Sequence, residues 1–311
     1  MVKIDLITGF LGAGKTTFIK KYASYFIKQG QTVGILENDY GAINVDMMLL
    51  QDLMSDNCEL EMISGGCDEE THRRRFKTKL ISMGMCGYDR VIVEPSGVYD
   101  IDEFFDVIHD EPLDKWYEIG NVIAIADAGL PEQMSKDAEY LLGSEAADAG
   151  LVFVSKLDES SKEQADTILP HINRAMEAIS CTRKLSEEDV MKKKWGELTN
   201  DDWNHILTCG YHTESWQKRD VEDDKSFSSL SFMNLPLTKE QILNAATQIL
   251  GDPSCGHVHR IKGFLETPDG WFELNATAAQ RQLNPIANGQ QIIIVIGEGL
   301  NKEKIEAYLQ A

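Results

Sequence analysis

The feature that most constrains the fold is the octapeptide from Gly9 to Thr16, which reads G-F-L-G-A-G-K-T. It lies between an apolar run at residues 3–8 and a stretch with helical character at residues 15–29, the strand, loop and helix context of a phosphate-binding loop, or P-loop. Glycines let backbone N–H groups turn inward around a phosphate, and the dipole of the following helix attracts negative charge. The pattern favours a nucleotide-binding loop over a chance glycine-rich turn.

Each part of this loop has an expected role. The Lys15 ammonium reaches the β- and γ-phosphates, and the Thr16 hydroxyl is a ligand for Mg²⁺. Loss of the Lys15 ammonium should cripple binding. The residues expected to surround the phosphates are Gly9, Gly12, Ala13, Gly14, Lys15, Thr16 and Thr17.

The first half of the chain alternates short apolar runs with segments of helix length. The runs lie at residues 3–8, 32–37, 90–94, 121–126 and 151–155, and nearly continuous Val, Ile, Leu and Ala is typical of strands buried on both faces. Strands separated by helices pair in parallel through right-handed crossovers. We expect residues 1–180 to form the doubly wound, mostly parallel α/β sheet of a P-loop NTPase.

The second half of the chain has a different character. Residues 181–225 are polar and charged and are interpreted as a connector, with one short helix capped by Asn200 and ended by Gly210. Strands are expected at residues 227–232, 258–266, 270–274 and 291–296, and helices at 238–250 and 301–309. Close strand spacing indicates a small α+β domain over residues 226–311.

Charge and cysteine usage restrict the partners and the compartment. The chain has 30 Lys and Arg against 51 Asp and Glu, a net charge of −21, which disfavours nucleic acid and anionic membranes as partners. Its apolar runs are far shorter than the roughly 20 residues of a membrane span. Six scattered cysteines favour reduced thiols over a disulfide framework, and the first residues do not read as a secretory leader. We expect a cytoplasmic protein.

A second motif indicates which base is bound. Ser155-Lys156-Leu157-Asp158 follows an apolar run and resembles the guanine-reading N/T/S-K-x-D element of GTPases. The Asp158 carboxylate can accept hydrogen bonds from N1–H and the exocyclic amine of guanine, which adenine does not offer, and Lys156 can lie across the base. A simple turn at the strand end is the alternative. Ser155, Lys156 and Asp158 are the expected contacts to the base of GTP.

Two acidic elements lie between these motifs in the sequence, E-N-D-Y-G at residues 37–41 and E-P-S-G at residues 94–97. Both follow predicted strands, whose carboxyl ends form the ligand crevice of such a sheet. Glu94 is expected to organise Mg²⁺ or its water, Gly97 to let the backbone approach the γ-phosphate, and Asp39 to touch the metal shell or the attacking water. Lys15, Asp39 and Glu94 are therefore the expected catalytic group, with polar caps at strand ends as the alternative.

Taken in order, G-F-L-G-A-G-K-T-T, E-N-D-Y-G, E-P-S-G and S-K-L-D resemble the CobW-like branch of the SIMIBI GTPases, which also includes relatives of HypB and UreG. H-R-I-K-G-F-L-E at residues 259–266 is similar to the short carboxyl-terminal domain of CobW-like proteins. The resemblance implies a GTPase of low turnover that forms a homodimer or docks on a client. It also implies that the nucleotide state gates delivery of a metal or cofactor to a client metalloenzyme.

One departure from the family pattern concerns the cargo. CobW-like metallochaperones typically carry G-C-x-C-C, whereas residues 66–70 read G-C-D-E-E. A site built from Glu37, Cys67, Glu69 and Glu70 would be harder than a thiolate site, which puts tight zinc handling in doubt and leaves Zn, Co, Ni and Fe open. The acidic loop is equally interpreted as the start of a helix.

A weaker metal candidate lies in the carboxyl-terminal region. Cys255, His257 and His259 alternate, so a strand would project all three from one face. Such residues can hold a transition metal or can simply be packed or exposed. The sequence offers no evident fourth ligand.

Three functions remain at this point. The leading one is a GTP-binding, slowly hydrolysing switch that acts as a metallochaperone or cofactor-insertion factor. The alternative is a GTP-dependent adaptor or reactivase for a metallo- or corrinoid-enzyme that binds no transition metal itself, which the missing cysteines favour. An ATP-dependent small-molecule kinase is the third, and it leaves S-K-L-D and the carboxyl-terminal domain unexplained.

Overall fold

Strand β1 (Val2–Thr8) runs through the middle of a seven-stranded parallel sheet, in the order β3-β2-β4-β1-β5-β6-β7. The computed structural model describes residues 1–39, 46–64, 69–97, 101–217, 227–278 and 280–310. All neighbouring strands of this sheet pair in parallel, which confirms the predicted fold class. The other strands are β2 (Val33–Asp39), β3 (Cys58–Ser64), β4 (Arg90–Pro95), β5 (Tyr117–Asp127), β6 (Leu151–Ser155) and β7 (Val190–Met191).

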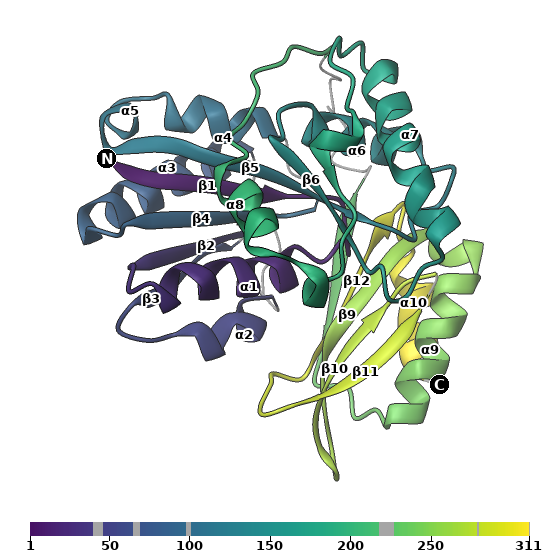
Figure 1. Cartoon of the computed structure of the whole chain (residues 1–311). Helices are drawn as coiled ribbons and strands as arrows, with labels where there is room; N and C mark the ends of the chain where they lie inside the picture. Colours follow the sequence, from purple (N-terminus) through teal and green to yellow (C-terminus); the bar gives the residue numbers. More distant parts are fainter. Residues whose placement is uncertain (40–45, 65–68, 98–100, 218–226, 279, 311) are drawn as a thin grey trace. The chain divides into compact units, whose positions relative to one another are not determined.

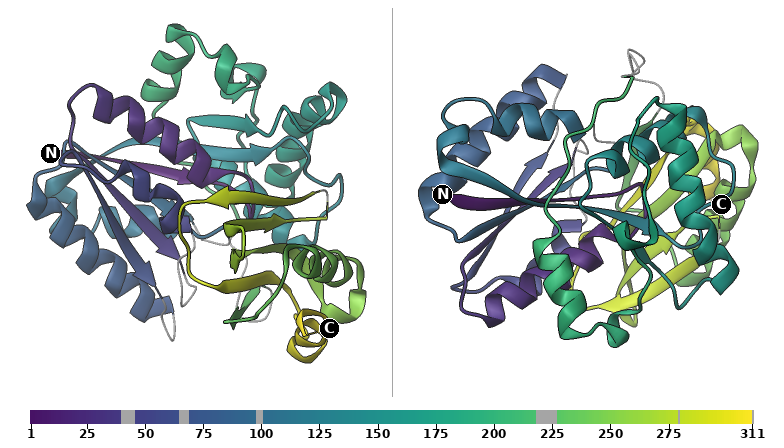
Figure 2. Two further views of the ribbon diagram at one scale, coloured as in Figure 1. Left: turned by 90° about the horizontal axis from the view of Figure 1, so that it is seen from below. Right: turned by 45° about the horizontal axis from the view of Figure 1, so that its top comes forward.

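Helices cover both faces of this sheet (Figures 1 and 2), as doubly wound topology requires. In Figure 2, α1 and α3 lie on opposite faces. The helices are α1 (Lys15–Lys28), α2 (Asp46–Leu50), α3 (Glu69–Cys86), α4 (Ile101–Ile108), α5 (Leu113–Trp116), α6 (Lys136–Ala147), α7 (Lys162–Ala178) and α8 (Asn200–Thr208), with 3-10 turns η1 (Gln51–Leu53), η2 (Glu187–Asp189) and η3 (Trp195–Glu197).

Helix α1 is fixed to the sheet by apolar packing and by one buried polar group. Phe18 and Tyr22 are fully buried in the core. The buried Asp5 carboxylate in β1 accepts hydrogen bonds from the Tyr22 hydroxyl and the Asn121 backbone N–H, both at 2.8 Å, and pairs with the Arg90 guanidinium. A buried charge is tolerated only when it is paired and hydrogen-bonded. These contacts set the position of α1, and therefore of the loop before it.

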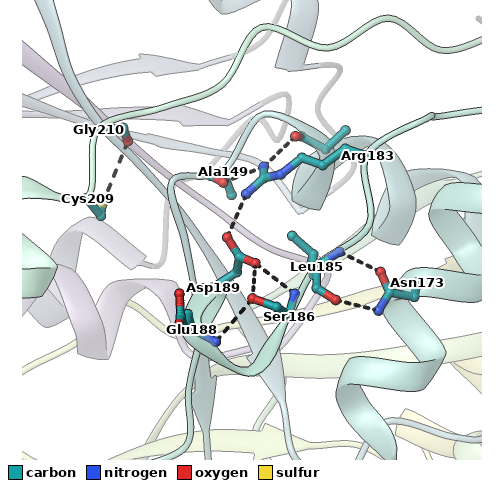
Figure 3. Close-up of polar contacts among 10 residues, drawn as sticks. Ala149, Asn173, Arg183, Leu185, Ser186, Glu188, Asp189, Cys209 and Gly210 are labelled. Carbon is teal, nitrogen blue, oxygen red and sulfur yellow. Dashed lines mark hydrogen bonds and ion pairs between the residues drawn. The ribbon is translucent and has the colours of Figure 1, made fainter.

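The segment that follows α7 packs back on this unit (Figure 3). The Arg183 guanidinium donates to the carbonyl oxygens of Ala147 and Ala149, each at 2.7 Å, and pairs with Asp189 at 3.3 Å. The Asn173 side chain exchanges hydrogen bonds with the Leu185 backbone at 2.8 and 3.0 Å. Because of these contacts the chain reaches β7 beside β6 and continues to η3 at the edge of the sheet.

Helix α8 begins one residue earlier than the sequence suggested. Its N-cap is Thr199, whose hydroxyl accepts a hydrogen bond from the Asp202 backbone N–H. In return, the Asp202 carboxylate accepts a hydrogen bond from the Thr199 backbone N–H. Asn200 is therefore the first helical residue and does not cap. The helix ends with Cys209 as its C-cap, just before Gly210.

The chain divides into two compact units, Met1–Arg219 and Asp220–Ala311. The second unit holds a five-stranded antiparallel sheet in the order β11-β10-β9-β12-β8. Buried residues of α9 and α10 share one core with this sheet, including Ile249, Ile261, Val295 and Ile305. The elements are β8 (Ser228–Met233), α9 (Lys239–Gly251), η4 (Pro253–Cys255), β9 (His257–Thr267), β10 (Gly270–Ala276), β11 (Arg281–Ile286), β12 (Ile292–Glu298) and α10 (Lys302–Leu309).

This carboxyl-terminal antiparallel sheet with its helices agrees with the predicted α+β character, although β11 was not foreseen. In the ranges given above, no helix is both long and apolar enough to cross a lipid bilayer.

Candidate functional site

The loop between β1 and α1 has the backbone that phosphate binding requires. Gly9, Gly12 and Gly14 all have positive φ, at 141°, 77° and 99°, a region that favours glycine. A Cβ at Gly9 would lie 2.3 Å from the Ile125 carbonyl oxygen, so β5 permits only glycine there. Gly14 is the N-cap of α1 and offers no side-chain acceptor. The first amides of α1 are thus left for an external anion.

Lys15 lies across its own loop. Its ammonium donates to the Gly9 carbonyl oxygen at 2.7 Å, and the residue is buried. The hydrogen bond holds the positive charge beside the loop amides, where a phosphate would meet both.

A hydroxyl and a carboxylate meet beside Lys15. The Thr16 hydroxyl donates to Glu94 Oε1 at 2.8 Å, and Glu94 is the next-to-last residue of β4, with 4% of its surface exposed. Glu37 in β2 is the register partner of Glu94 and is also buried. Asp39 is the last residue of β2, at the same edge of the sheet. The oxygen donors of Thr16, Glu37 and Glu94 are hard ligands that fit Mg²⁺, with Thr16 and Glu94 as the residues that would hold it.

The loop after β4 touches the phosphate-binding loop directly. A Cβ at Gly97 would lie 2.8 Å from the backbone nitrogen of Leu11, so only glycine permits this approach. The Ser96 backbone N–H donates to the Asn38 carbonyl oxygen at 2.8 Å, which ties this loop to the end of β2. The three segments expected to surround the phosphates therefore lie together.

The turn expected to read the base is attached to the same loop. The Ser155 hydroxyl donates to the Ala13 carbonyl oxygen at 2.5 Å. Lys156 has a positive φ of 54°, and its ammonium donates to Asp127 at 2.6 Å. Asp158 is 74% exposed at its side chain and pairs with Lys194 at 2.6 Å. An exposed ion pair contributes little stability, so its carboxylate is readily available to a base.

Two residues of this region were missed by sequence reasoning. Asp127 ends β5 in register with Ser155, and the rule that selected Glu94 at a strand end would have found it. Lys194 lies just after β7, in a run of lysines that was assigned to the connector. Its hydrogen bond with Asp158 raises the pKa of Lys194.

A third unforeseen residue is Glu145, which is buried in α6 next to the phosphate-binding loop. Burial raises the pKa of Glu145 to about 8, against the opposing effects of the Lys15 charge, the Thr8 hydroxyl and the Gly9 backbone N–H. Its carboxyl group is therefore mainly protonated at neutral pH and does not neutralise the Lys15 charge.

The expected transition-metal set is only partly visible. Cys67 lies outside the described residues, and Glu69 is described only as the first residue of α3. Glu70 is exposed and pairs with Arg74 one turn further along α3, at 2.7 Å. Of the four expected ligands, Glu37 is the one that lies in a strand of the sheet, next to Glu94 in the ladder between β2 and β4.

The candidate metal site in the carboxyl-terminal region consists of different residues from those predicted. Cys255 is buried in η4, and Gly256 separates it from β9 with a φ of 96°, so the strand alternation expected from residue 255 does not hold. Within the described ranges, His257 and His259 instead gather with Glu298 of β12. Glu298 was not foreseen because it is 39 residues from His259 in the sequence.

Comparison with known proteins agrees with this geometry. Residues 3–183 match the family model described as CobW/HypB/UreG, nucleotide-binding domain. The chain belongs to the CobW/HypB/UreG family. The resemblance inferred from the motifs is confirmed by this match, which covers more than half of the chain.

Relatives in this family carry related names. The zinc chaperone YjiA of Escherichia coli (strain K12) is 26% identical over 174 residues, which cover 52% of this chain and 52% of that protein. The zinc-regulated GTPase metalloprotein activator 1 of Schizosaccharomyces pombe is 20% identical over 268 residues, 84% of this chain and 58% of that protein. The matches thus span little more than half the length of these curated relatives.

The solved structure of the Zn(II)-bound YjiA GTPase from E. coli aligns over 99% of this chain and 97% of that chain, with 19% identity and a TM-score of 0.38.

Proposed function

We propose that this CobW/HypB/UreG family member is a GTP-dependent switch that hydrolyses GTP slowly and couples its nucleotide state to delivery of a metal or metal cofactor to a client metalloenzyme. The observation that carries the proposal is the hydrogen bond from Ser155 to Ala13. It joins the base-reading turn to the phosphate-binding loop, so one nucleotide can contact both. The names of the relatives, zinc chaperones and a metalloprotein activator, support the same conclusion.

The choice of guanine rests on Asp158. Its carboxylate accepts two hydrogen bonds from the edge of guanine, and it would exchange the exposed Lys194 ammonium for the base. Adenine offers no pair of donors there, so an unmatched carboxylate would penalise ATP. Lys156 is held by Asp127, in a position to cover the base with its aliphatic stem.

The phosphate chemistry consists of positioning and charge stabilisation. The loop amides and Lys15 bind the phosphates, and Thr16 with Glu94 orients the metal site. Mg²⁺, when bound there, neutralises charge that develops on the β- and γ-phosphate oxygens. Asp39 and Gly97 are proposed to meet the attacking water and the γ-phosphate. Lys15 is the one cation of the described residues that is hydrogen-bonded to the loop, so turnover without a partner should be slow, on the order of 10⁻⁴ to 10⁻² s⁻¹.

A second candidate is an adaptor that acts on its client by contact alone and carries no transition metal. The pairing of Glu70 with Arg74 favours it, because this gives one of the expected ligands another partner. G-C-D-E-E also lacks two of the three thiolates of the usual motif.

The proposal is tested by capturing partners with the full-length chain loaded with a non-hydrolysable GTP analogue, with GDP, or with no nucleotide. A metalloenzyme enriched only in the GTP-analogue sample, with a transition metal bound to the recovered chain, is the expected result. The same enrichment without metal supports the adaptor. Identical partner sets in all three samples would refute the switch.

A further inference from the structure

Three side chains with metal-binding atoms gather on the sheet of the second unit. His257, His259 and Glu298 each offer one ligand atom, and these atoms lie within 4.8 Å of one another. The His259 Nε2 to Glu298 Oε1 distance is 2.6 Å, and the His257 Nδ1 to Glu298 Oε1 distance is 3.8 Å. The two imidazole rings are 4.3 Å apart at their centroids. Two imidazoles and a carboxylate form a common donor set for divalent transition metals.

The backbone of the two paired strands brings these residues together. His257 of β9 is directly opposite Glu298 of β12 in the antiparallel ladder, which places their side chains next to each other. The register shifts between Ile296 and Gly297, so that β9 carries one more residue than β12 at this point, a β-bulge. Bulges redirect a side chain, and here the extra residue is His259.

Gly297 is required for this arrangement. A Cβ at that position would lie 2.3 Å from the His257 carbonyl oxygen and 2.9 Å from the Val258 Cα. Only glycine therefore lets β12 approach β9 closely enough for Glu298 to reach both imidazoles. The two strands lie side by side in Figure 1.

We propose that His257, His259 and Glu298 form a binding site for one divalent ion of the Zn²⁺ type, built from other residues than those of the nucleotide site and of the G-C-D-E-E segment. Bonds of about 2.0–2.1 Å in tetrahedral geometry place ligand atoms about 3.3 Å apart. The two distances to Glu298 Oε1 lie on either side of that value, and all three ligand atoms lie within 4.8 Å of one another, so side-chain rotations can bring them to it. His257 is 63% exposed at its side chain, which leaves room for water or a ligand from a partner as the fourth donor.

The plain alternative is a hydrogen-bonded His259–Glu298 pair at the end of a sheet, with His257 nearby for no functional reason. A pair needs no third ligand, and replacing His257 would then have no effect on metal binding. The contribution of His257 therefore separates the two interpretations.

The test is a titration of the full-length chain with Co²⁺, followed by visible absorption, and with Zn²⁺ in competition with a chromogenic chelator. All proteins carry Cys67→Ser, Glu69→Gln and Glu70→Gln, so that the G-C-D-E-E segment does not contribute. One ion should bind per chain, with Co²⁺ bands typical of four-coordinate nitrogen and oxygen ligation. His259→Ala, Glu298→Gln and His257→Ala should each weaken binding at least 10-fold, the order of effect expected for loss of one ligand.

The matched control is His205→Ala, an exposed histidine on α8, which should bind as the parent does. A parent that binds no ion, or a His257→Ala variant that binds as tightly as the parent, overturns the proposal. His257 is exposed, so its replacement keeps the fold even if His259→Ala does not. GTP affinity, measured on the same samples, should not change, and its loss would bear on the proposed function and not on this site.

Discussion

The Ser155 hydroxyl donates a hydrogen bond to the Ala13 carbonyl oxygen at 2.5 Å, although the two residues are 142 positions apart. The same hydroxyl lies 3.2 Å from the Ala126 carbonyl oxygen at the end of β5. Both acceptors are backbone carbonyl oxygens, so the contact with Ala13 depends on the backbone of the phosphate-binding loop. It sets the distance between the segments that would hold the two ends of one nucleotide.

Replacing Ser155 by Ala should weaken GTP and ATP binding to a similar extent. The change removes the hydrogen bond from the Ser155 hydroxyl to the Ala13 carbonyl oxygen, and a hydrogen bond of this kind contributes about 1 kcal/mol, or roughly 5-fold in affinity. Isothermal titration with each nucleotide measures it. Ser82→Ala, at an exposed position of α3, is the control. A variant with unchanged affinity would show that the contact is incidental.

Replacing Asp158 by Asn should change the preferred base. The amide donates where the carboxylate accepted, so affinity for GTP should fall about 100-fold or more while xanthosine triphosphate, with an oxygen in place of the 2-amino group, gains. Competition with a fluorescent nucleotide measures both. Glu163→Gln, exposed in the first turn of α7, should behave as wild type. If Asp158→Asn kept its GTP affinity, the carboxylate would not read the base.

Removal of Mg²⁺ should lower GTP affinity and stop hydrolysis, and Thr16→Ala should make the protein insensitive to that removal. The hydroxyl shared with Glu94 is lost in this variant, and with it a ligand of the metal site. Phosphate release should fall at least 100-fold. The measurement is GTP affinity and turnover with Mg²⁺ and with EDTA, and Thr78→Ala, exposed on α3, is the control. Equal Mg²⁺ dependence in Thr16→Ala and wild type would contradict the assignment.

The stability of the nucleotide-free protein should fall as the pH rises from about 5 to 8. Burial raises the pKa of Glu145 from 4.5 to about 8 and that of Asp148 from 3.8 to about 7. In this window the unfolded carboxyls have released protons that the folded ones retain, so the folded state binds more protons and loses stability with rising pH. At a pH below the pKa values that these two carboxyls have in the unfolded chain, both states are protonated and this loss of stability is absent.

Glu145→Gln keeps the shape of the protonated acid and cannot ionise. It should raise the free energy of unfolding at pH 8 by about 2–4 kcal/mol and flatten the profile between pH 5 and 8. Chemical denaturation across that range measures both effects. Glu177→Gln, exposed on α7, should leave the profile as it is. A variant less stable than wild type at pH 8 would show that the ionised carboxylate stabilises the loop.

Much of the fold and of the candidate site could be predicted from local sequence. The loop from Gly9 to Thr16 and the turn at Ser155 are contiguous motifs, and parallel strands bring their carboxyl ends to one edge of the sheet. Glu37, Glu94 and Asp127 share that edge for the same reason. The sequence could not predict which charged residues approach this edge from other helices and strands.

The missed residues depend on tertiary contacts. Lys194 reaches Asp158 because Arg183 and Asn173 hold the preceding segment against the carboxyl end of α6 and against α7. Glu145 is an acid that a helix usually exposes, and its burial follows from the packing of α6 against the loop. Glu298 meets His259 through a strand ladder and a bulge, neither of which has a local signal.

The most direct test of the central claim is the affinity of the purified chain for GTP and for ATP in the presence of Mg²⁺. If the loop at Lys15 and the carboxylate at Asp158 contact one nucleotide, GTP should bind at least 100-fold more tightly than ATP. Equal affinities, or a preference for ATP, would contradict the account.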